Sequence, residues 1–136
     1  INPLEMQLQV FLKQLEIAFK LNKLVSMHLV FRNGGCLTQV LEIIKNLKQK
    51  YNTNPLIILH SCSLSFEQFK EFEKCHSNTL IGVSYLNIDS KLISKTKKLL
   101  VKETDYVDDK QYKDKWDKVK DFQCYENEKL IMSYLQ

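Results

Sequence analysis

The feature that most constrains the fold of this chain is a regular alternation of long amphipathic segments with short apolar runs. Apolar residues recur at helical spacing within residues 4–21 and 37–47. Short runs rich in Leu, Ile and Val come between such segments, and the run Leu56-Ile57-Ile58-Leu59 contains no polar residue. Runs of this kind are typical of strands that are buried on both faces of a parallel sheet. The alternation therefore predicts an α/β fold.

The same pattern, together with turn residues, places the individual elements. Strands are expected at residues 24–30, 56–59, 80–85 and 99–102, and helices at residues 4–21, 37–47, 66–73 and 91–98, with one or two closing helices near the C-terminus. Ser65 and Gln68 form the pattern of a capping box, and Ser90 is the expected cap of the fourth helix. Segments of helical length separate successive strands, as right-handed crossovers between parallel strands require. This order fits either an open sheet or part of a barrel.

Composition and charge exclude several classes of protein. No apolar run among the 136 residues approaches the roughly 18 that cross a bilayer, so no membrane segment is expected. The cysteines are widely separated and form no CxxC pair; they are Cys36, Cys62, Cys75 and Cys124. This spacing favours free thiols in a reducing compartment. We therefore expect an intracellular protein of the cytoplasm or nucleus. The net charge of +4 suits a phosphate-bearing partner, but it also suits helices with solvated lysine faces. Because the chain begins at Ile1 without an initiator Met, we expect a processed protein or part of a longer one.

Polar residues follow three of the expected strands, at the ends where parallel α/β folds carry their chemistry. His28 follows the first strand, His60 follows the second, and Asp105 lies just beyond the fourth. Two imidazoles and a carboxylate at one rim can bind a divalent metal, which lowers the pKa of a bound water and polarises a phosphoryl oxygen. A single histidine at a strand end is more often a hydrogen-bonded rim residue, so spacing alone leaves both interpretations open. His76 lies in a polar segment and is expected at the surface.

QLEIA stands at residues 14–18, before the strand that ends at His28, HSCSLSFEQ at residues 60–68 and ETD at residues 103–105. In this order the three segments resemble the motifs of the TatD family of metal-dependent deoxyribonucleases. Residues 14–28 are similar to the helix and strand usually written QLELA…PVVIH, and residues 60–68, HSCSLSFEQ, are similar to HCFSGSLEQ. Residues 103–105, ETD after an apolar strand, are similar to ETDSP. Order, separations and strand-end positions agree across residues 7–106. The resemblance implies the C-terminal half, about strands five to eight, of a TIM-like (β/α)8 metal-dependent hydrolase barrel.

This resemblance divides the chain and assigns roles to its polar residues. Residues 1–136 would be one partial barrel domain, in which residues 1–106 are TatD-like and residues 107–136 form a closing helical segment. By the same analogy, His28 and His60 would hold one divalent metal ion. Asp105 would bind a second ion and accept the proton of the attacking water, and Glu103 would be a ligand or an acidic partner that orients the site. The analogy leaves Mg²⁺, Mn²⁺ and Zn²⁺ open as the metal.

The resemblance also implies DNA as the substrate. Ser63 and Ser65 lie near the start of a helix, where backbone N–H groups favour anions, and could face a substrate phosphate. Arg32 lies where the family has a Cys-Arg-Asp run and could supply a cation to the same substrate. Leu64 replaces a loop glycine of the family, which changes the backbone freedom beside His60.

Part of the family's metal site has no counterpart in this chain, which begins just before strand five. The first-strand HxH pair and the fourth-strand glutamate are missing, so we expect the N-terminal half-barrel, or another chain, as a partner. The complete protein is expected to be an enzyme, and this stretch alone to be inactive. Since strands five and eight would each expose an unpaired edge, this stretch is not expected to be a stable monomer.

The departures from the family motifs favour an alternative, a non-catalytic TatD-like scaffold or complex subunit. Tyr106 and Val107 stand where the family has Ser-Pro, and the loops after His28 and around Leu64 also differ. The charged segment 110–120, with Trp116 as an aromatic anchor, would suit a protein partner. It would equally suit an exposed helix whose tryptophan faces the core.

Overall fold

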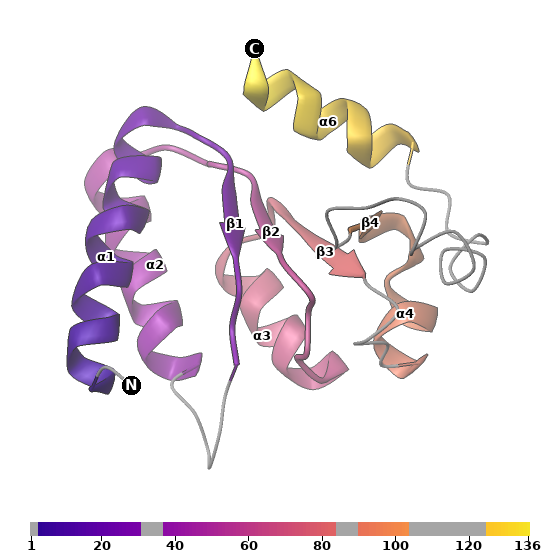
Figure 1. The fold of residues 1–136 in the computed structure, drawn as a ribbon, viewed down its shortest axis with the longest axis horizontal. Helices are drawn as coiled ribbons and strands as arrows, with labels where there is room; N and C mark the ends of the chain where they lie inside the picture. The colour runs from indigo at the N-terminus through magenta and orange to yellow at the C-terminus, as the bar shows by residue number, and fades with distance from the viewer. Residues whose placement is uncertain (1–2, 31–36, 84–89, 104–124) are drawn as a thin grey trace, which may run out of the picture.

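Four strands in the described part of the chain form one parallel sheet in chain order (Figure 1). A computed structural model describes residues 3–30, 37–83, 90–103 and 125–136. The strands are β1 (Val25–Met27), β2 (Ile57–Leu59), β3 (Thr79–Val83) and β4 (Leu100–Lys102), and each pairs in parallel with the next. Each connection therefore steps to the adjacent strand in one direction, which is the connectivity of a βα barrel.

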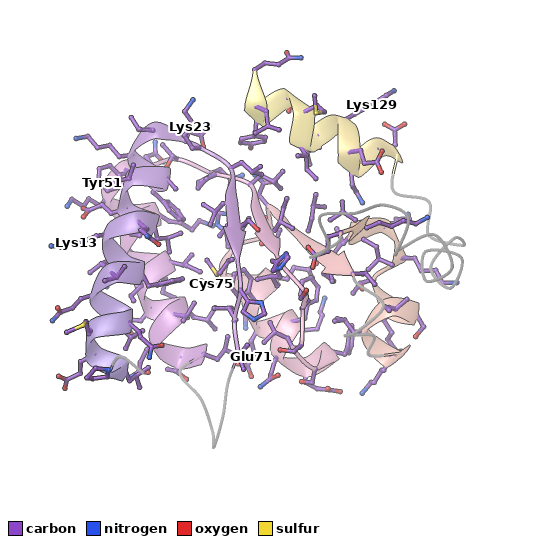
Figure 2. The ribbon with its side chains drawn as sticks, in the orientation of Figure 1. Lys13, Lys23, Tyr51, Glu71, Cys75 and Lys129 are labelled. Carbon is purple, nitrogen blue, oxygen red and sulfur yellow. The ribbon has the colours of Figure 1, made fainter. Side chains whose placement is uncertain are left out.

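One helix precedes each strand. These helices are α1 (Leu4–Leu21), α2 (Leu37–Tyr51), α3 (Phe66–Cys75) and α4 (Ser90–Lys95); a 3₁₀ turn η1 (Lys97–Leu99) leads into β4, and α6 (Tyr125–Leu135) comes last. Figure 1 shows α1 and α2 packed next to each other beside β1. Lys13 of α1, labelled in Figure 2, points away from the sheet, as expected for a solvated helix face. Within the described ranges, no helix is both long and apolar enough to cross a membrane.

The side-chain alternation of the strands divides the core into two clusters. Met27, Leu59 and Ile81 point to the helical face, where they join buried residues of α1 to α4 such as Phe19 and Phe69. The alternate strand positions point to the opposite face. A smaller cluster there is formed by Leu56, Leu80 and Val101, against which Ile131 and Tyr134 of α6 pack. In a closed barrel the first face is the outside and the second is the interior.

Most of the expected elements are confirmed. The helix at 4–21 is observed with those bounds, and the capping box is present: the Gln68 N–H donates to Ser65 Oγ at 3.1 Å, and the Ser65 N–H donates to Gln68 Oε1 at 2.9 Å. The expected fourth helix at 91–98 is wrong at its C-terminal end, because the helix stops at Lys95. Thr96 donates its hydroxyl hydrogen to the Leu92 carbonyl, a side-chain bond of a kind that competes with regular helix. The side chain of Ser90, the expected cap, lies outside the described residues.

The surface position expected for His76 is wrong, since this side chain is fully buried. His76 closes the C-terminal end of α3, where its Nε2 lies 2.7 Å from the Pro55 carbonyl oxygen and its ring meets Phe19 edge-on at 5.7 Å. The polar neighbours that suggested a surface loop turn outward, whereas the imidazole packs between α1 and the segment before β2. Burial lowers the pKa of His76 below its usual value.

Candidate metal-binding site at the carboxyl ends of the strands

Three polar side chains immediately follow three of the strands. His28 comes after β1, His60 after β2 and Glu103 after β4, in each case as the first residue beyond the strand. Met27 and Leu59 point to the helices, so the residues after them point to the opposite face. The parallel sheet therefore brings all three to one rim on the face that would line a barrel.

The Glu103 carboxylate holds the turn after β2. Its Oε2 lies 3.0 Å from Nδ1 of His60, and its Oε1 accepts a hydrogen bond from the backbone N–H of Ser61. Ser61 has a left-handed φ of 44°, uncommon for a residue other than glycine. The Glu103 side chain is 14% exposed and that of His60 is 30% exposed. The carboxylate is thus largely removed from water and engaged at both oxygens.

His28 lies against the same turn. Its Nδ1 is 3.2 Å from the carbonyl oxygen of His60, and the two imidazole centroids are 5.6 Å apart with planes inclined by 60°. Two imidazoles that share one ion through Nε2 have centroids about 5 Å apart, from metal–nitrogen distances of about 2 Å. The observed separation is close to that value.

The tautomers of both histidines follow from their acceptors. A carbonyl oxygen and an ionised carboxylate can only accept, so Nδ1 carries the hydrogen in His28 and in His60. In the neutral ring, Nε2 then carries the lone pair and is the nitrogen that can bind a metal. Metal-binding histidines commonly donate their other N–H to a carboxylate or a carbonyl in this way. The two histidines therefore fit a divalent ion by their chemistry.

The other expected site residues fall into two groups. Ser63 is exposed at the same rim and donates its hydroxyl hydrogen to the Leu29 carbonyl at 3.2 Å, whereas the Ser65 hydroxyl caps α3. Asp105 and Arg32 lie outside the described residues, so their predicted roles stay predictions.

In the described part of the chain, no three His, Cys, Asp or Glu side chains are grouped to hold one ion. The orientation of Glu103 explains this, because its carboxylate faces His60 Nδ1 and the turn.

Two hollows lie beside His28 at the open edge of β1. One, of about 410 Å³, runs between α1 and β1 and is bordered by Phe11, Ala18, Ser26 and His28. The other, of about 320 Å³, lies between the start of α1 and the residues after β1, and Leu4, Phe11 and His28 border it. His28 is therefore accessible from the side on which β1 has no neighbouring strand within the described residues.

Sequence inspection did not single out Gly82 or Ser61, which also shape the rim. A lone glycine inside an expected strand can signal the close approach of another group, and that signal was present in the run LIGVSY. No pattern in the sequence indicates the left-handed turn at Ser61.

The chain order of the parallel strands, the helices on one face and the polar rim at the carboxyl ends fit part of a TIM-like βα barrel. The family described as TatD related DNase matches residues 2–123, and the chain belongs to this family.

Among solved structures, the chain is similar to that titled "Crystal structure of an uncharacterized amidohydrolase from Saccharomyces cerevisiae". The TM-score is 0.56 and the identity is 19%, a likeness that shows the fold. The match covers 88% of this chain and 42% of that one, so this chain spans less than half the length of its structural neighbour. No curated protein matches the chain significantly.

Proposed function

We propose that the complete protein is a metal-dependent hydrolase that cleaves DNA phosphodiester bonds, and that this chain supplies the C-terminal half of its active site. The observation that carries the proposal is the pairing of His28 with His60, each held through Nδ1 by an acceptor. This arrangement prepares both Nε2 atoms to bind a divalent ion. Membership of the TatD related DNase family supports DNA as the substrate.

Each polar residue of the rim has a distinct part in this proposal. When bound, a divalent ion lowers the pKa of a coordinated water and polarises a phosphoryl oxygen. His28 and His60 hold that ion, while Glu103 fixes the tautomer and direction of His60 rather than binding metal itself. Asp105 accepts the proton of the attacking water and, in the complete barrel, helps to hold a second ion.

The substrate would be held by groups next to the metal ligands. Ser63 presents its hydroxyl at the rim, near the start of α3, whose first N–H groups favour a phosphate. Arg32 would add a cation, and Ser65 would act through its cap by fixing the start of the helix. The chemistry of these groups does not distinguish Mg²⁺, Mn²⁺ and Zn²⁺ as the metal.

The partner that we propose is the N-terminal half-barrel of this family, on the same or another chain. The hollow between α1 and β1 follows the open edge of β1, where a further parallel strand would pair. An apolar stripe on α1 is also uncovered, with side chains more than half exposed at Met6, Val10, Ile17 and Leu21. These positions share one helical face, and the helix preceding such a strand could cover them.

The test uses the full-length protein, with whatever sequence lies upstream. We expect it to bind divalent metal and to hydrolyse DNA, and we expect His28→Ala, His60→Ala and Asp105→Ala each to lose most activity. Lys129→Ala, at an exposed position of α6, is the matched control and should keep the activity. A full-length protein that binds no divalent metal would refute the proposal. If the protein binds metal and hydrolyses other substrates but not DNA, only the assignment of DNA as the substrate is refuted.

A scaffold function is the second candidate, and the departures from the family motifs after His28, at Leu64 and after Asp105 favour it. In that case the rim would be a remnant, and the charged segment 110–120, which lies outside the described residues, would contact a protein. The upstream sequence discriminates between the two candidates. An HxH motif with a strand-four glutamate supports the enzyme, and their absence supports the scaffold.

A further inference from the structure

The middle of the rim is formed by β3, and the described residue of β3 at the level of His60 is a glycine, without a side chain. β3 lies between β2 and β4, and its residue next to His60 is Gly82, one position beyond the Leu59–Ile81 pair. The Gly82 carbonyl accepts a hydrogen bond from the Cys62 N–H at 3.1 Å, so the backbone of β3 also contacts the turn that follows His60.

The space above Gly82 is filled by the Glu103 carboxylate. A Cβ atom built on Gly82 would lie 2.6 Å from Cδ and 2.9 Å from Oε1 of Glu103, and still nearer to Oε2. Real Cβ atoms do not approach other atoms within 3.0 Å, so any side chain at this position would displace the carboxylate. Glu103 can reach from β4 to the turn after β2 only because β3 has a glycine there.

We propose that Gly82 is a positioning residue: its missing side chain opens the path by which the Glu103 carboxylate crosses β3 and orients His60. The Ser61 N–H, in a residue with a left-handed φ, donates to the second carboxylate oxygen and completes a clamp in which Glu103 holds both His60 and the turn after it. The arrangement therefore depends on three strands: His60 follows β2, Gly82 of β3 leaves room for the carboxylate, and Glu103 follows β4.

The clamp has a chemical consequence for His60. With both oxygens engaged, Glu103 keeps the hydrogen on Nδ1 and prevents rotation of the ring, so Nε2 keeps a fixed direction. Loss of such a partner commonly lowers metal affinity by about 10- to 100-fold. This consequence depends on the proposed function, whereas the clamp itself does not.

The first experiment observes the clamp without metal. In the metal-free full-length protein, the Nδ1–H of His60 should give an exchange-protected, downfield NMR signal that disappears in Glu103→Ala. We expect Gly82→Ala to abolish the signal as well. Two controls should keep it. Ser61→Gly retains the N–H and tolerates a left-handed φ, and Val101→Ala weakens the packing of the same sheet face while every hydrogen-bonding group of the clamp is kept. Persistence of the signal in Gly82→Ala would overturn the proposal.

A double-mutant cycle covers the case in which Gly82→Ala does not fold. If the added methyl group collides only with Glu103, its effect on unfolding should largely vanish in the Glu103→Ala background. We therefore expect Gly82→Ala/Glu103→Ala to fold and to unfold at nearly the same denaturant concentration as Glu103→Ala. An equal destabilisation in both backgrounds would overturn the proposal, because the collision would then lie elsewhere.

Metal titration separates this inference from the proposed function. Calorimetric titration with Mn²⁺ or Zn²⁺ should show an affinity about 10- to 100-fold lower in Gly82→Ala and unchanged in Val101→Ala. If the wild-type protein binds no metal but Gly82→Ala loses the His60 signal, the proposed function fails while the clamp stands. If the wild type binds metal and Gly82→Ala retains both signal and affinity, the positioning role fails alone.

Discussion

The burial of His76 makes the stability of the fold depend on pH in the weakly acidic range. Its Nε2 donates to the Pro55 carbonyl at 2.7 Å, which leaves the lone pair on Nδ1, and no hydrogen-bond partner for Nδ1 exists in the described part of the chain. Protonation of Nδ1 would place a charge and an unsatisfied donor in a fully buried position. Burial accordingly lowers the pKa of His76; the bond to Pro55 opposes this effect, and the charge of Lys48 adds to it.

The sign and size of the pH effect follow from that lowered pKa. Unfolded His76 titrates near 6.5, whereas folded His76 titrates lower, so the unfolded chain binds more protons between the two values. The stabilising contribution of neutral His76 is therefore complete above pH 6.5 and declines as the pH falls toward the folded pKa. The free energy of unfolding should fall there by up to about 1.4 kcal/mol per pH unit, the limit for one proton.

The assay is denaturant unfolding, followed by circular dichroism, of the full-length wild-type protein and of its His76→Gln variant from neutral pH to about pH 5. The glutamine amide can still donate to Pro55 but does not titrate. All other titrating groups are common to the two proteins and largely cancel in the difference of their unfolding free energies. That difference should shift in favour of His76→Gln as the pH falls below 6.5. A difference that stays constant over this range would refute the reasoning.

Three further predictions concern the stability of the fold, the first two in the full-length protein and the third in residues 1–136 alone. Ser65→Ala removes the oxygen that accepts the Gln68 N–H, and should lower the free energy of unfolding by about 1 kcal/mol in thermal or urea unfolding; no change would mean that the cap is not needed. Phe72→Ala leaves a cavity at a fully buried position and should cost about 3–5 kcal/mol, measured by chemical denaturation, and a loss below 1 kcal/mol would contradict the packing. Residues 1–136 alone should not unfold as a cooperative monomer, because β1 has no neighbouring strand on its outer side within the described residues and the α1 stripe is exposed. Calorimetry showing a soluble monomer with one sharp transition would contradict this.

The secondary structure could be predicted because it depends on local pattern. The helix at 4–21 follows from apolar spacing, and the start of α3 follows from the Ser65–Gln68 pair, both of which lie within a few residues. β1 is shorter than the expected 24–30, because its paired length is set by β2, which ends at Leu59. A strand boundary of this kind depends on a partner more than thirty residues away, which no local pattern contains.

The rim could be predicted in part, for a similar reason. That His28 and His60 follow strands is visible in the sequence, and parallel pairing brings such residues together. The passage of Glu103 over Gly82 depends on the registers of three strands and on the conformation of Ser61, so the sequence alone could not predict it. The expected exposure of His76 was wrong for a different reason. Its polar neighbours in the sequence suggested a surface position, but tertiary packing determines whether one side chain is buried.

The last helix has a consequence for how the chain is made. Tyr134 of α6 lies 3.0 Å from Asn78 Nδ2 and 3.3 Å from the carbonyl oxygen of Asn54, a partner 80 positions earlier, and Ile131 packs with it on the face formed by Leu80 and Val101. During synthesis the whole sheet therefore leaves the ribosome before the helix that covers this face. Contacts so distant along the chain form slowly. In the interval the exposed apolar face is a site where a chaperone could bind, and a ribosome that pauses before residue 125 would prolong that interval.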